Sequence, residues 1–165
     1  MKNLTFTIIT VLSTGLFSYG QQTPIIEKRA QNIFVEFLGQ GLLVTANYDT
    51  RFTNKRNGIG GRIGIGYIND SVNGITTIPV GINYLLGKKS SFFEIGLGAT
   101  YFGTNRDRKT IFENSEENSF IGTMSFSYRL QPVDSGFSFR GGITPIFNSK
   151  FFLPYYVGVS LGYTF

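Results

Sequence analysis

The sequence predicts an all-β fold, namely an eight-stranded antiparallel up-and-down transmembrane β-barrel that follows a cleaved signal peptide. Apolar and small polar residues alternate in one segment after another, and turn signals separate these segments. The alternation is clearest at residues 157–165, where the large side chains share one face of a strand: Val157, Val159, Leu161, Tyr163 and Phe165. The opposite face carries Gly, Ser and Thr, which suits lipid on one side and a narrow lumen on the other.

Composition supports a membrane protein built from strands. Aromatic residues make up 16% of the chain and charged residues only 15%, against ~25% charged residues in typical soluble domains. The mean hydropathy is nevertheless only +0.03, because small polar residues dilute the apolar ones evenly. Beyond the first twenty residues, no stretch approaches the ~20 consecutive apolar residues of a membrane helix. A helical membrane protein is therefore excluded.

The first twenty residues have the pattern of an export signal. Lys2 precedes a mostly apolar run over residues 4–17, and small residues at Ser18 and Gly20 favour cleavage before Gln21. We expect a signal peptide at 1–20, a periplasmic lead-in at 21–32 and the barrel at 33–165. The chain has no cysteine, so a lipid-modified cysteine at the N-terminus and disulfides are both excluded.

The first expected hairpin is the least regular. Residues 33–38 form the candidate first strand, which turns at residues 39–41, but six residues fall short of the ~9–11 that a spanning strand needs. The strand could extend back through Ala30, or residues 33–52 could form one long bulged strand. In the second segment the apolar face is Leu42, Val44, Ala46, Tyr48 and Phe52, and the polar face is Thr45, Asn47, Asp49 and Arg51.

The remaining segments alternate in the same way. Their apolar faces lie within residues 63–67, 78–84, 93–101, 120–130, 137–147 and 151–165. Most carry an aromatic residue near an end of the apolar face, as the aromatic girdles of membrane barrels do. Gly64 and Gly66 fall within such a strand. We interpret them as small residues beside bulky lumen neighbours and not as a phosphate-binding loop.

The turn segments predict an orientation. They occupy residues 53–58, 69–74, 87–90, 104–118, 131–136 and 148–150. Bacterial barrels have short periplasmic turns, longer external loops and, in this type, both termini inside. Counting back from Phe165 places the longest link, 104–118, outside. A soluble lipocalin-like or sandwich domain would instead carry Lys, Glu and Gln opposite the apolar face, where this chain has mostly Gly, Ser and Thr.

Several stretches resemble a known group of proteins. These are residues 36–41, 47–52, 77–89 and 139–147, together with the C-terminal strand. They resemble small, mostly uncharacterised outer-membrane β-barrel proteins of Gram-negative bacteria. The resemblance implies export and insertion into the outer membrane, and it brings no ligand or catalytic residues. Tyr163 and Phe165 also resemble the C-terminal signal that the barrel-assembly machinery recognises.

The chain has no histidine, the usual general base and a common metal ligand. We therefore expect no enzyme, no metal site and no cofactor. The net charge of +5 is modest, and no basic cluster is interleaved with aromatics, so nucleic acid is not an expected partner. Lys88 and Lys89 lie in a turn-like segment, which predicts a solvated loop or contacts with anionic lipid headgroups.

The expected lumen face is rich in charge. Its predicted network consists of Asp49, Arg51, Arg62, Glu94, Arg129 and Arg140. An eight-stranded barrel has an interior only just filled by side chains, and buried charges there must pair. We interpret the network as a carboxylate–guanidinium plug. The alternative is a site at one mouth for a small anion or polar solute.

The longest outer link is the candidate interaction loop, with Arg106, Arg108, Lys109 and Phe112 as its expected contact residues. It could bind a partner, a surface or lipopolysaccharide phosphates, or it could be a solvated loop of mixed charge. The sequence thus favours a structural or surface-interaction role in the cell outer membrane, with lipids, lipopolysaccharide and the assembly machinery as partners. The alternative role is binding or passage of a small solute through a narrow barrel.

Overall fold

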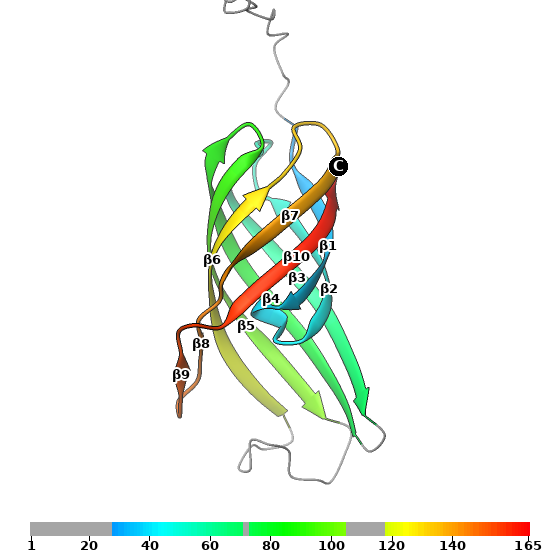
Figure 1. Ribbon diagram of the computed structural model, residues 1–165, viewed down its shortest axis with the longest axis vertical. Helices are drawn as coiled ribbons and strands as arrows, with labels where there is room; N and C mark the ends of the chain where they lie inside the picture. The colour runs from blue at the N-terminus through cyan, green and yellow to red at the C-terminus, as the bar shows by residue number, and fades with distance from the viewer. Residues whose placement is uncertain (1–27, 71–72, 105–117) are drawn as a thin grey trace, which may run out of the picture.

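The computed structural model describes residues 28–70, 73–104 and 118–165, and within them it is a closed antiparallel β-barrel (Figure 1). Eight strands form the wall: β1 Gln31–Leu38, β2 Val44–Arg51, β3 Gly58–Asp70, β4 Asn73–Lys88, β5 Ser91–Thr104, β6 Asn118–Leu130, β7 Gly136–Ile143 and β10 Val157–Thr164. Each pairs with the next, and β1 pairs with β10 to close the sheet. The predicted eight-stranded antiparallel barrel is confirmed. The expected signal peptide lies outside the described residues.

The seam between β1 and β10 leaves no free sheet edge between these strands. Ile33 lies opposite Tyr163 and Phe37 opposite Val159. The pairing continues past the strand ends, where Gln31 and Phe165 each donate a backbone hydrogen bond to the other, at 3.3 and 3.0 Å. Closure matters in lipid, because unpaired backbone groups there have no water to bond.

The first hairpin consists of two strands, so the alternative of one long bulged strand over 33–52 is wrong. The two strands are joined through a 3₁₀ turn, η2 Gly39–Gly41. Leu38, Gly39 and Leu42 have φ of 61°, 63° and 68°, which is the left-handed region that reverses the chain tightly. At Gly39 a Cβ would also lie 2.6 Å from Cδ of Glu36. β1 begins at Gln31, two residues before the expected start.

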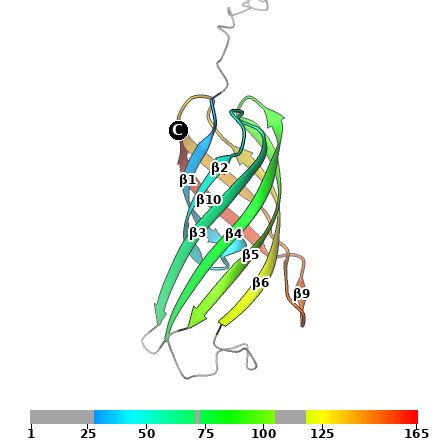
Figure 2. The same cartoon turned by 180° about the vertical axis from the view of Figure 1, so that it is seen from behind.

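A small hairpin interrupts the expected last two strands. β7 ends at Ile143, and β8 Ile146–Phe147 and β9 Phe152–Leu153 project beside the wall before β10 begins (Figures 1 and 2). Pro145 and Pro154 flank this hairpin, and proline cannot donate a ladder hydrogen bond. The last barrel strand therefore starts at Val157 and not near Phe151. No helix among the described residues is long and apolar enough to cross a membrane.

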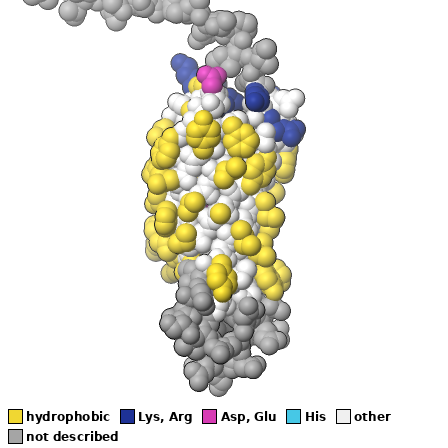
Figure 3. Space-filling model, turned by 90° about the vertical axis from the view of Figure 1, so that its right-hand side faces the viewer, with side chains coloured by type: hydrophobic (Ala, Val, Ile, Leu, Met, Phe, Trp, Pro, Cys, Tyr) yellow, Lys and Arg dark blue, Asp and Glu magenta, His cyan; other side chains and the backbone are white. Residues whose placement is uncertain are grey.

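The barrel is apolar outside and polar inside. Ile63 and Ile82 on the outer face are 54% and 53% exposed, whereas Arg51 and Glu94 on the inner face are fully buried. Figure 3 shows the apolar side chains spread as a broad band across the face of the wall in view. The soluble arrangement, with apolar side chains inward, is therefore excluded, because strand alternation has placed the apolar set on the surface.

The strand directions divide the turns between two ends of the barrel. The chain enters β1 and leaves β10 at the same end (Figure 1), which we call the terminal end. The links 52–57, 89–90 and 131–135 also lie there. η2, the link 144–156 and the strand ends that flank residues 71–72 and 105–117 lie at the opposite end. The strands on either side of the longest link, β5 and β6, thus meet it at the end away from the termini.

Candidate functional site

The inner face of the barrel brings seven charged side chains together. They come from six strands: Glu36 on β1, Asp49 and Arg51 on β2, Arg62 on β3, Glu94 on β5, Arg129 on β6 and Arg140 on β7. All seven are buried. Each occupies an inward position of its strand because residues two apart share one face of a sheet.

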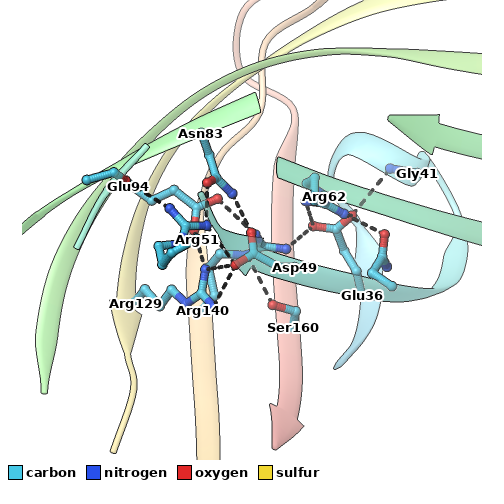
Figure 4. A network of polar contacts seen from close by, with 12 residues as sticks. Glu36, Gly41, Asp49, Arg51, Arg62, Asn83, Glu94, Arg129, Arg140 and Ser160 are labelled. Atoms are coloured by element: carbon cyan, nitrogen blue, oxygen red, sulfur yellow. Dashed lines mark hydrogen bonds and ion pairs between the residues drawn. The ribbon is translucent and has the colours of Figure 1, made fainter. Parts of the chain in front are cut away.

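These charges form one continuous chain of ion pairs, shown in Figure 4. At one end, Arg62 binds Glu36 at 2.7 Å, and Glu36 binds Arg140 at 2.8 Å. Arg140 then binds Glu94 at 2.8 Å, and Glu94 binds Arg129 at 3.2 Å. Positive and negative groups alternate throughout this half, so each carboxylate lies between two guanidiniums.

The other end of the chain reaches across to β2. Arg129 binds Asp49 at 3.1 Å, and Asp49 binds Arg51 at 2.7 Å. The chain therefore begins and ends on arginine, with four guanidiniums against three carboxylates. We call these seven residues the charge chain.

Register explains why a carboxylate is needed between two of the arginines. Arg129 and Arg140 lie directly opposite each other across β6 and β7. Like charges at such positions repel, and Glu94 accepts hydrogen bonds from both guanidiniums. The negative charge of Glu94, on β5, therefore offsets the repulsion between these two buried guanidiniums.

Neutral side chains and backbone groups complete the network. Asn83 on β4 donates to Asp49 and accepts from Arg51. Asn47 accepts from Arg62 at 2.8 Å, and Ser160 accepts from Arg140 at 3.2 Å. The Gly58 carbonyl accepts from Arg51 at 2.9 Å, and the Gly41 N–H donates to Glu36 at 3.3 Å. These bonds use donors and acceptors that would be costly to bury unpaired.

Phe34 is an aromatic residue on the inner face, between two of the guanidiniums. Its ring centroid lies 5.1 Å from Cζ of Arg62 and 4.4 Å from Cζ of Arg140. Both distances are within the range of a cation–π contact. Phe34 therefore fills space beside the charge chain while contributing attraction to two of its cations.

Small residues make room for the long side chains. A Cβ at Gly60 would lie 2.3 Å from Cζ of Arg51, and one at Gly64 would lie 2.1 Å from Oδ1 of Asn47. Neither position could hold a side chain without moving the network. This agrees with the interpretation of the strand glycines as small residues beside bulky lumen neighbours.

The η2 turn occupies the lumen on the side away from the termini. Gln40 is buried, and the hydroxyl of Thr100 on β5 donates to its backbone carbonyl. The hydroxyl of Tyr156, between β9 and β10, donates to the carbonyl of Leu42 and so ties the turn to the wall. The lumen is filled at two levels, by this turn and by the charge chain.

The space left beside the charge chain is small. A cavity of about 10 Å³ is lined by Asn32, Phe34, Arg129, Ser138, Phe139, Arg140 and Ser160. That volume is about enough for one water molecule. Within residues 28–70, 73–104 and 118–165, no group of three or more His, Cys, Asp or Glu side chains is placed to hold a metal ion.

The structure brings together all six residues of the sequence-derived lumen network. It adds Glu36, which sequence reasoning missed and which makes two of the six ion pairs. The signal was present, because Ile33, Val35 and Phe37 alternate with Phe34 and Glu36, and the apolar-outward rule puts Glu36 inside.

The other sequence-derived residues lie away from the lumen. Tyr163 and Phe165 lie at the terminal end with exposed side chains, opposite β1. The candidate interaction loop, with Arg106, Arg108, Lys109 and Phe112, falls outside the described residues.

The fold is similar to that of a solved structure. It is the N-terminal β-barrel domain of Pseudomonas aeruginosa OprF, with a TM-score of 0.54 and 9% sequence identity, and the match covers 84% of this chain and 98% of that domain. No protein-family model and no curated protein sequence matches the chain. At this identity the likeness shows the fold alone, so the chain shares with the OprF domain a closed eight-stranded antiparallel β-barrel.

Proposed function

We propose that this chain is an outer-membrane β-barrel protein with a plugged polar lumen, and that it serves as a membrane-embedded scaffold that presents its outer loops for interaction. One observation carries the proposal. A continuous chain of six buried ion pairs fills a barrel whose outer surface is apolar. The apolar surface supports insertion into lipid, and the filled interior supports a role other than open transport.

The dimensions of the apolar surface support a bilayer setting. On β5 the outward face runs from Phe93 to Tyr101, which corresponds to about 20 Å along the barrel axis at ~3.3 Å per residue and ~40° tilt. Membrane barrels carry an apolar band of ~25 Å with aromatic girdles at its edges. At the outer edge of this band, the rings of Tyr101 and Phe120 lie 5.3 Å apart. A strand-based protein of this kind belongs in an outer membrane.

The chain directions support an orientation with the terminal end in the periplasm. The long link 105–117 then lies outside the cell, where barrels of this type carry their longer loops. Tyr163 and Phe165, at the terminal end of β10, would serve as the signal for the assembly machinery. Resemblance to small Gram-negative outer-membrane barrels supports the same placement.

The charge chain supports a plug in preference to a pore. Each carboxylate binds two guanidiniums, and opening the lumen would separate several of these pairs. Leaving a buried charge without its partner costs several kcal/mol, so a closed state is strongly favoured. The same arrangement supports a non-enzymatic role, since the three carboxylates of the charge chain are each bound to two guanidiniums.

A second candidate function is the binding or passage of a small anion. The observation that favours it is the excess of guanidiniums over carboxylates, four against three, in the lumen. This surplus would attract an anion if the chain of pairs rearranged. The same residues would then act as a narrow selectivity region.

Conductance of the refolded protein in planar bilayers separates the two functions. We expect a heat-modifiable shift in electrophoresis, β-rich circular dichroism and no steady unitary conductance steps. Steady anion-selective steps would overturn the plug and favour solute passage. A protein that stays soluble without detergent and shows no shift would overturn the membrane assignment itself.

The outer loop is tested separately. Replacing residues 105–117 by an Asn-Gly turn should leave the heat-modifiable shift intact and abolish binding to immobilised lipopolysaccharide. A second variant changes Arg106, Arg108 and Lys109 to Gln in the intact loop, and it should weaken binding to lipopolysaccharide. Unchanged binding in both variants would remove this loop from the proposal.

A further inference from the structure

The exposed cations of the described residues gather at one end of the barrel. Figure 3 shows Lys and Arg side chains at the terminal end, directly beyond the apolar band. We call the exposed members of this group the basic arc: Lys28, Arg29, Lys55, Lys88 and Lys89. At the opposite end, the one exposed cation among the described residues is Lys150.

The basic arc is continuous along the rim. Its members precede β1, lie in the β2–β3 and β4–β5 links or, in the case of Lys88, end β4, and the strands β1 to β5 are neighbours in the sheet. The segment before β1 is connected to the end of β2 because the Arg51 N–H donates to the Ala30 carbonyl at 3.2 Å. The β2–β3 link is connected to the end of β4 because the Asn57 side chain donates to the Gly87 carbonyl at 3.3 Å.

The arc carries more charge than the acidic side chains near it. Among the described residues one exposed acid, Asp134, lies at this end, in the β6–β7 link, which meets the β4–β5 link where the Gln131 N–H donates to the Ser90 carbonyl at 2.8 Å. Arg56 also lies at this end, but its guanidinium donates to the Pro132 carbonyl, so we leave it out of the arc. Five cations therefore face outward along one half of the rim.

The arc is level with the edge of the lipid-facing surface. Phe52 is exposed three residues before Lys55, and Leu86 is exposed two residues before Lys88. Lysine side chains in this position extend along apolar surface and place their ammonium groups among lipid headgroups. Anionic headgroups attract such cations, and the attraction is a matter of charge more than of exact geometry.

We propose that the basic arc binds the phosphate groups of anionic glycerophospholipids in the leaflet at the terminal end of the barrel. This proposal rests on the proposed membrane function and names a lipid class and a site for it. The lipid would gather beside β1 to β5 and not around the whole barrel. Removing one cation should reduce the enrichment of the anionic lipid by about fivefold at most, because the screened attraction between one cation and the headgroups is modest.

Native mass spectrometry tests the proposal. The folded full-length protein is released from nanodiscs of mixed phosphatidylglycerol and phosphatidylcholine, and the lipids that stay bound to it are identified by mass. The wild type should retain phosphatidylglycerol above its fraction in the mixture. A variant with Lys28, Arg29, Lys55, Lys88 and Lys89 all changed to Gln should lose this enrichment. The control changes Lys150, the exposed cation of the described residues at the opposite end, to Gln and should keep it.

Three results would overturn the proposal. The first is a wild type that inserts but shows no enrichment, and the second is equal loss in the arc variant and the control. The third is displacement of the lipid by inorganic phosphate but not by chloride at equal ionic strength, which would indicate a general phosphate site. A wild type without a heat-modifiable shift would instead overturn the membrane function on which the proposal rests.

Discussion

Replacing Arg140 by Leu should destabilise the barrel strongly, because Arg140 links the Glu36 and Glu94 carboxylates within the charge chain. Its guanidinium donates to Glu36 and Glu94 at 2.8 Å each and to Ser160 at 3.2 Å. Hydrogen bonds to charged groups contribute about 1.5–3 kcal/mol each. Removing one partner of a buried pair costs about 3–5 kcal/mol. Both carboxylates keep a second arginine, so we expect a loss of about 3–5 kcal/mol in the free energy of unfolding.

The assay is urea unfolding of the protein folded in lipid vesicles, followed by circular dichroism and by the heat-modifiable electrophoretic shift. Arg140→Lys keeps the charge but not the two-pronged geometry, so its loss should be intermediate. Lys150→Leu removes an exposed cation at the end of the barrel away from the network. Its free energy of unfolding should change by less than about 0.5 kcal/mol.

A double-mutant cycle distinguishes ion pairing from packing. Combining Arg140→Leu with Glu94→Gln removes both partners of one pair, so the combined loss should be smaller than the sum of the single losses by about 1–3 kcal/mol. Additive losses, or an unchanged unfolding midpoint for Arg140→Leu, would show that paired charges do not hold the lumen together.

Three further changes test other parts of the structure. Glu36→Gln should cost about 3 kcal/mol in the same urea assay, because two arginines lose a buried carboxylate, and a neutral result would exclude it from the network. Gly142→Ala should prevent folding, because its Cβ would lie 2.3 Å from a backbone oxygen, whereas Gly103→Ala, with its nearest atom at 3.4 Å, should fold and show the heat-modifiable shift. Tyr156→Phe should cost about 1 kcal/mol through the lost hydrogen bond to Leu42. Burial, and then the Glu36 carboxylate, raise the pKa of Tyr156 above its ordinary value. The excess in the free energy of unfolding of the wild type over Tyr156→Phe should therefore be complete below about pH 10 and shrink as the pH rises through the folded-state pKa of Tyr156. A difference that does not change with pH would contradict this.

The eight-stranded barrel and the identity of its two faces could be predicted from the sequence because both follow from local chemistry. A period of two in side-chain direction assigns each residue to a face whatever the neighbouring strand is. The same rule placed Asp49, Arg62 and Glu94 inside. The same alternation places Glu36 inside, beside Phe34, once residues 31–38 are paired as a strand.

The two local departures from that pattern could be predicted only in part. The η2 turn needs left-handed backbone at Leu38 and Leu42, residues that give no turn signal by type. Their conformation is stabilised by contacts made after folding, among them the Tyr156 hydrogen bond to the Leu42 carbonyl. The β8–β9 hairpin has proline at its edges, but its pairing with β6 depends on how far β7 extends.

The alternating pattern along the chain is enough to show one lipid-compatible face and one polar face, with enough charge on the polar face to require pairing. Which charges pair depends on the folded barrel. Asp49 lies directly opposite Arg62 across β2 and β3, yet Arg62 binds Glu36 and Asp49 binds Arg129 on β6. The reason is physical: contacts across a lumen depend on strand tilt, register and closure of the whole barrel, and these are properties of all eight strands together.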